Sequence, residues 1–90
     1  MENKETIKEN LKRAGYQEIH EYVDESNVVF PEHDHEGTQC MVVVRGSISV
    51  TMDGQEHILV AGSELTIPAK TKHSAKVGSE GCESLLGEKI

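Results

Sequence analysis

Apolar residues recur with a helical period at the start of the chain. Ile7, Leu11 and Ala14 are separated by four and three residues, which places their side chains on one face of a helix. Asn3 stands just before this segment, and asparagine is favoured at helix N-termini because its side chain accepts a backbone hydrogen bond. The pattern therefore predicts one short amphipathic helix at about residues 4–14.

After Gly15 the apolar residues follow a period of two, which is typical of strands. The segment 47–52 alternates strictly, and the dipeptide Asp53-Gly54 that follows it is a strong signal for a two-residue hairpin turn. Gly46 is expected to separate this segment from the valine-rich strand before it. We expect seven or eight short strands, at about residues 16–23, 28–30, 39–44, 47–52, 55–60, 64–67, 73–77 and 82–86.

One helix followed by many short strands predicts an all-β fold. Short strands at close spacing are typical of antiparallel sandwiches and barrels. The chain has 90 residues, which suits a single domain with one modest core over residues 1–90. We therefore expect a small antiparallel β-barrel, closed or nearly closed, at about residues 16–87.

Charge and composition exclude several partners. The net charge of −7, from 16 acidic and 9 basic residues, repels phosphate backbones and anionic lipid surfaces. Only 3% of the residues are aromatic, which leaves little surface for stacking on nucleic-acid bases. The longest apolar run, 40–44, is far shorter than the roughly 20 residues of a membrane span. We expect neither nucleic acid nor membrane as a partner, and the charged segment 1–10, without an apolar signal region, predicts a cytoplasmic protein.

The two cysteines, Cys40 and Cys82, are far apart in the sequence and form no CxxC pair. A small secreted scaffold held by disulfides would carry more cysteines. We interpret both residues as reduced thiols, and a structural disulfide between them is the alternative.

Two of the five histidines suggest a metal site. His33 and His35 are two positions apart, and in an extended strand such residues point to the same side. Two imidazoles on one side can chelate a single transition-metal ion. The same parity continues through Gln39, Met41 and Val43, so we expect all five side chains to point inward.

The segment around these histidines has the spacing of a known motif. His33 and His35 are followed after three residues by Gln39 and after six more by Gly46. This segment resembles the first motif of the cupin family, G(X)5HXH(X)3-4E(X)6G. Gln39 departs from the motif because it replaces the usual glutamate, and Asn27 departs from it because it stands where the leading glycine is expected.

A second segment resembles the second cupin motif, G(X)5PXG(X)2H(X)3N. Gly62 is followed after five residues by Pro68, and His73 comes five positions later, at the start of a predicted strand. Lys70 and Val77 replace the glycine and the asparagine of this motif. We expect these two departures, like Asn27, to affect turns rather than chemistry. The short segment between the two motifs is similar to that of small bacterial cupins.

The resemblance implies a small jelly-roll barrel in which His33, His35 and His73 bind a divalent transition metal. Gln39 would occupy the fourth protein position, and the candidate ions are Fe, Mn, Ni, Co and Zn, all of which accept imidazole nitrogen. Because the amide of Gln39 is neutral, the charge of the ion stays uncompensated, and its open positions are expected to attract an anion. The alternative is a cupin whose histidines line a pocket without a metal.

Several functions are open to such a protein. The leading hypothesis is dioxygenase-like chemistry on a small, anionic molecule. A non-catalytic module that senses or stores a small ligand or a metal is one alternative. A metal-dependent isomerase or lyase is another, but it needs a base, and no paired carboxylate falls on the inward parity of the motif strands. Tyr22 is the phenol best placed to reach the site, whereas Cys40 is expected to face away from it.

The expected partners are a small-molecule ligand or substrate and a second copy of the chain. The first predicted strand, 16–23, is expected to leave an exposed edge, and such edges tend to be paired or blocked. Cupins commonly dimerise through their sheets, so the resemblance implies a homodimer.

Overall fold

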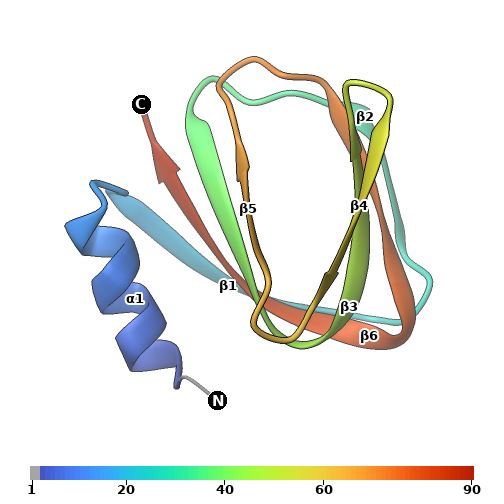
Figure 1. Ribbon diagram of the computed structural model, residues 1–90, viewed down its shortest axis with the longest axis horizontal. Helices are drawn as coiled ribbons and strands as arrows, with labels where there is room; N and C mark the ends of the chain where they lie inside the picture. Colours follow the sequence, from blue (N-terminus) through green and yellow to red (C-terminus); the bar gives the residue numbers. More distant parts are fainter. Residues whose placement is uncertain (1–2) are drawn as a thin grey trace.

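One helix and six strands make up most of the computed structural model, which describes residues 3–90 (Figure 1). Met1 and Glu2, which we assigned to the same domain, lie outside the described residues. Within residues 3–90, no helix is long and apolar enough to cross a membrane. The elements are α1 (Lys4–Arg13), β1 (Glu18–Asp24), β2 (Val29–His33), β3 (Thr38–Met52), β4 (Gln55–Val60), β5 (Glu64–Ile67) and β6 (His73–Lys89).

Helix α1 confirms the predicted helix. The side chain of Asn3 accepts a hydrogen bond of 2.8 Å from the backbone N–H of Thr6, which caps the first turn. Ile7 and Leu11 are both buried. Burying an aliphatic side chain contributes about 1.5–3 kcal/mol, and this packing holds a helix of ten residues that is too short to be stable alone.

Strands β3 and β6 are each continuous where the sequence suggested two short strands. They pair antiparallel along nearly their whole lengths, with register shifts close to Gly46. Gly46 has a φ of 76°, and a side chain there would collide with the carbonyl oxygen of Gly81. Glycine at this point bends the strand without ending its ladder. The expectation that Gly46 separates two strands is therefore wrong.

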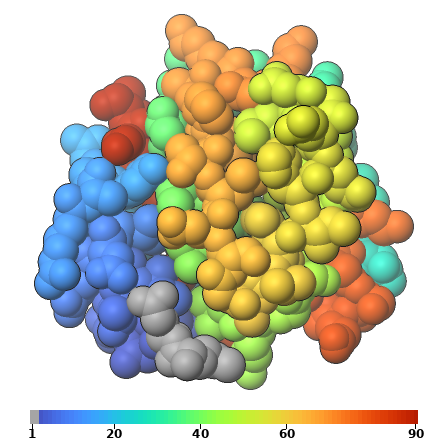
Figure 2. All heavy atoms as spheres, viewed as in Figure 1, coloured from blue at the N-terminus to red at the C-terminus, as the bar shows by residue number. Residues whose placement is uncertain are grey.

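The two bent strands run through both halves of the fold. One half has the strand order β1-β6-β3-β5 and the other has β2-β6-β3-β4. All the ladders are antiparallel, which confirms the all-β class. Within residues 3–90 the sheet does not close into a complete barrel, because β1 and β2 pair only with β6, and β4 and β5 only with β3. Side chains fill the space between the β4 and β5 ribbons of Figure 1, as the space-filling view shows (Figure 2).

The core consists of two clusters on opposite faces of β3. Val42 and Val44 pack beneath the helix, whereas Val43 points into the interior of the barrel. Residues alternate between the two faces of a strand, so a strand covered on both faces is apolar throughout. Cys40 belongs to the helix-side cluster and Cys82 to the interior one, and both thiols are free. The disulfide alternative is therefore wrong, and Cys40 faces away from the interior as expected.

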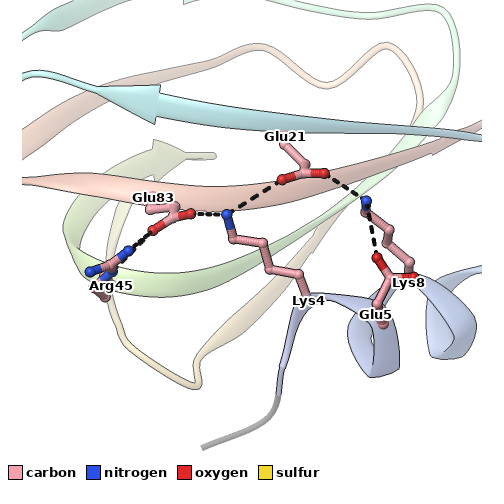
Figure 3. A network of polar contacts seen from close by, with 6 residues as sticks. All are labelled: Lys4, Glu5, Lys8, Glu21, Arg45 and Glu83. Carbon is pink, nitrogen blue, oxygen red and sulfur yellow. Dashed lines mark hydrogen bonds and ion pairs between the residues drawn. The ribbon is translucent and has the colours of Figure 1, made fainter.

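A chain of ion pairs fastens the helix to the sheet (Figure 3). Lys4 pairs with both Glu83 and Glu21, and Lys8 lies 2.6 Å from Glu21. Arg45 donates two hydrogen bonds to Glu83, of 2.8 and 3.0 Å. The network therefore joins α1 to β1, β3 and β6 at one edge of the helix-side cluster.

Candidate metal centre

Three imidazoles meet at one end of the barrel. His33 is the last residue of β2 and His73 the first of β6, and the two are directly opposite each other in the ladder. His35 lies beyond the end of β2, so the expectation that it shares a strand with His33 is wrong. The three residues nevertheless converge, and each offers a ligand atom within 4.8 Å of the others.

Backbone hydrogen bonds orient two of these rings. The Nδ1 atom of His33 lies 2.6 Å from the carbonyl oxygen of Pro31, and that of His73 lies 2.9 Å from the carbonyl oxygen of Thr71. Because a carbonyl oxygen only accepts, each Nδ1 carries the proton and donates it. The Nε2 atoms keep their lone pairs, which is the tautomer that a metal needs.

The three rings differ in exposure. His33 is the most accessible, His35 is partly buried and His73 is buried, at 5% exposure. Burial lowers the pKa of His35, and the neighbouring charges of His33 and His73 lower it further. His35 is therefore held toward its neutral form, which is the form that binds metals.

Gln39 lies on β3 at the same end of the barrel. Its side chain is buried, at 4% exposure, and lines the cavity into which the three histidines point. Met41 lines the same cavity, and Val43 belongs to the interior cluster, so the predicted inward parity of this row is confirmed. A neutral amide thus stands beside the three imidazoles.

The motif departures keep the backbone shape that glycine usually provides. Asn27 has a φ of 63° and Lys70 a φ of 60°, both in the left-handed region, as is Gly62 at 92°. The backbone N–H of Lys70 donates a hydrogen bond of 2.7 Å to the carbonyl oxygen of His35. As expected, Asn27 and Lys70 shape turns, and the turn at Lys70 also helps to hold the loop that carries His35. The same expectation is wrong for Val77, which lies within β6 and is fully buried in the interior cluster.

The histidines open into a cavity of about 300 Å³ with mostly apolar walls. Tyr22, the phenol best placed to reach the site, lines this cavity and is 43% exposed. Asp24 and Ser84 also line it, and sequence reasoning missed both. The predicted strand 16–23 ends one residue before Asp24, although the parity of Asp24 with Tyr22 places it on the inner face of β1.

Comparisons with known proteins agree with this geometry. The sequence profile of the cupin domain matches residues 20–85. Over 51 residues the chain is 37% identical to quercetin 2,3-dioxygenase of Bacillus subtilis strain 168, a match that covers 56% of this chain and 15% of the dioxygenase.

Solved structures resemble the fold at lower identity. An RmlC-like cupin from Shewanella frigidimarina matches with a TM-score of 0.71 and 22% identity, over 80% of this chain and 65% of that one. An oxalate decarboxylase of Bacillus subtilis matches with a TM-score of 0.69 and 23% identity, over 77% of this chain and 20% of that one. Because the cupin profile spans most of the chain and the fold agrees, the chain belongs to the cupin family.

Proposed function

We propose that the chain binds one divalent transition metal through His33, His35 and His73, with Gln39 as a fourth ligand, and uses it for dioxygenase-like chemistry on a small, anionic molecule. The observation that carries this proposal is the convergence of the three imidazoles within 4.8 Å, two of them with Nδ1 bound to backbone carbonyls. Both features suit a nitrogen-rich centre for a first-row transition metal.

The donor set determines what else the centre binds. Three imidazoles and an amide are all neutral, so none of them compensates the charge of a divalent ion. An anionic oxygen of a substrate is therefore attracted to any position that the protein leaves open. A redox-active ion such as Fe or Mn would supply the electron-transfer chemistry that an oxidation requires.

The protein itself contributes a cavity with mostly apolar walls. Phe30, Met41, Ile67 and Leu86 form part of its wall, and they exclude water from a bound molecule. The cavity of about 300 Å³ suits a ligand of one ring or a short chain rather than a polymer. The partial similarity to a quercetin dioxygenase supports an oxidative reaction, although the chain spans only 15% of that protein's length.

A metal-dependent isomerase or lyase is the second candidate, and Asp24 is the observation that favours it. The carboxylate lines the cavity and is a base of the kind that such a reaction needs. The register places it opposite Cys82, near the bend of β6, whereas the histidines lie at the other end of the barrel. This separation favours the dioxygenase-like function.

Metal analysis and oxygen uptake together test the proposal. The untagged chain is purified without a nickel column, loaded separately with Fe(II), Mn(II), Ni(II), Co(II) and Zn(II), and mixed with quercetin and a panel of small enols, diols and thiols. We expect one metal per chain and oxygen uptake with an enol in the Fe or Mn form, absent in His73→Ala. A chain that binds no metal would contradict the centre. Stoichiometric metal without uptake would instead favour a non-catalytic module that binds a small ligand or a metal.

We also propose that the chain forms a homodimer. Among residues 3–90, strand β1 pairs only with β6, so its other edge lacks a strand partner, and Val23 on this strand is 80% exposed. Edges of this kind favour pairing with another chain.

A further inference from the structure

The cavity has a second polar region on the side of β1. Asp24 and Ser84 line the same cavity as the three histidines. Asp24 is opposite Cys82 in the ladder, and Tyr22 is opposite Ser84. Residues directly opposite in an antiparallel pair point to the same face. Because Cys82 belongs to the interior cluster, the side chains of Asp24 and Ser84 both face the inside of the barrel.

Neither of these polar side chains has a partner in the part of the chain that the structure describes. Ser84 is only 3% exposed, yet its hydroxyl forms no hydrogen bond with residues 3–90. The Asp24 carboxylate has no hydrogen bond or ion pair there either, and burial raises its pKa. Asp24 is only partly buried, and among residues 3–90 no buried side-chain nitrogen or oxygen atom lacks a hydrogen-bond partner. The two groups are therefore open to the cavity, where they can bind a polar group of a ligand.

The register gives the separation between the two polar regions. Ser84 is opposite Val43, and Val43 lies four residues along β3 from Gln39. At about 3.3 Å per residue, Gln39 and Ser84 are about 13 Å apart along the strand. The wall between them is largely apolar, with Met41 on β3 and Leu86 on β6. A ligand that reaches both ends is therefore elongated and has an apolar middle.

We propose that Asp24 and Ser84 bind a hydroxyl group of the ligand, so that the site takes a small aromatic acid or enol with an anionic oxygen at the metal and a hydroxyl at the far end. This inference rests on the proposed function, because it takes the three histidines as the metal end. Asp24 accepts a charge-assisted hydrogen bond from the hydroxyl, and Ser84 supplies a second polar contact.

Two matched compounds test the inference by calorimetry. The probes are 3-(4-hydroxyphenyl)propanoate and 3-phenylpropanoate, which share the carboxylate and differ only in the far hydroxyl. We expect the metal-loaded chain to prefer the hydroxylated probe by about tenfold or more, the usual effect of a hydrogen bond to a charged group. The preference should fall to about threefold or less in Asp24→Asn, and it should also be reduced in Ser84→Ala. Glu25→Gln is the matched control, because it removes the adjacent, exposed carboxylate and should leave the preference unchanged.

The outcomes separate this inference from the proposed function. Metal binding is measured first, and the same titrations are repeated with the metal-free chain. A preference for the hydroxylated probe that depends on Asp24 supports the inference even if the chain binds no metal. Failure to bind metal would refute only the proposed metal centre. Equal binding of the two probes, no binding of either, or a preference that survives in both variants overturns it. Thermal melts confirm that each variant is folded.

Discussion

His33 and His73 are cross-strand partners in the ladder between β2 and β6, and their ring centroids lie 4.4 Å apart. The two imidazoles therefore come together through strand pairing, although they are 40 positions apart in the sequence. Because the ladder holds both backbones, the metal centre should be formed before any metal arrives. The third imidazole, His35, depends instead on a loop.

Substitution of either paired histidine should remove the metal. We expect His33→Ala and His73→Ala each to lower metal affinity by about a hundredfold or more, since each deletes one ligand of a chelate. The check is metal content after gel filtration, together with the rise in melting temperature when metal is added. Bound metal stabilises the native wild-type chain by about 2.7 kcal/mol at a hundred times its Kd. His20→Ala, on exposed β1, serves as control, and one metal per chain in both variants would refute the assignment.

Gln39→Glu should strengthen metal binding and weaken anion binding. The change adds a negative charge beside a divalent ion in a partly buried site, where charges interact strongly, so we expect roughly a tenfold gain or more in metal affinity. Azide should bind less tightly, because the added charge repels it. Titrations of metal and of azide measure both effects, with the exposed Gln55→Glu as matched control.

Two results would contradict these expectations. An unchanged metal affinity in Gln39→Glu would mean that the amide is not a ligand and instead orients a metal-bound water. An unchanged azide affinity would refute the charge argument.

The turn at Lys70 should tolerate glycine but not valine. Left-handed backbone costs about 1–2 kcal/mol for residues with a side chain, and a β-branched residue fits it worst. Lys70→Val should therefore lower the free energy of unfolding by about 1–2 kcal/mol, and by displacing the loop of His35 it should also weaken metal binding. Lys70→Gly should change the free energy of unfolding little, because relief of backbone strain in the folded state offsets the added freedom of the unfolded chain.

Denaturant unfolding and metal titration measure both effects. Lys72→Val is the control, since Lys72 is exposed in the same loop and lacks the positive φ. Equal effects of valine at the two positions would argue against the role of the turn.

The ion pairs of the helix should make stability fall in acid. Hydrogen bonds from Lys4 and then Arg45 hold the pKa of Glu83 below its ordinary value of 4.5. A carboxyl whose pKa is lowered by folding stabilises the native state above the unfolded pKa, and this contribution is lost as the pH falls through the lowered value. Thermal melts between pH 7 and pH 3 should show a weaker pH dependence for Glu83→Gln than for the wild type.

The exposed Glu80→Gln is the matched control for this experiment, because Glu80 also lies on β6 but takes no part in the ion pairs of the helix. It should follow the wild-type curve. A Glu83→Gln curve parallel to that of the wild type would show that the network does not contribute to stability.

At a protein concentration of tens of micromolar, sedimentation equilibrium should give a mass twice that of a single chain. A charged residue on the edge strand, introduced by Val23→Lys, should shift the equilibrium toward the monomer, because charges on an edge oppose pairing. Ile58→Lys is a suitable control, since Ile58 is also exposed but lies on β4. A monomeric mass for the wild type would contradict the dimer.

Local patterns in the sequence were sufficient for much of the fold and for the list of candidate ligands. The helical period of Ile7 and Leu11 and the capping position of Asn3 depend only on near neighbours, and the structure confirms them. The inward parity of Gln39 follows from strand geometry in the same way. The left-handed positions of Asn27 and Lys70 could be expected from the motif spacing, because a turn constrains only a few residues.

Only the tertiary structure decided how these pieces combine. Gly46 looked like a strand end, but a continuous ladder with β6 carries β3 through it, and such pairing depends on residues far away in the sequence. The same long-range pairing sets His33 against His73. The parity of Asp24 with Tyr22 is a local signal, but nothing local marks Ser84. The two residues share a cavity only because β1 and β6 pair in one particular register. Periodicity therefore determined which way side chains face, and strand pairing determined which of them meet.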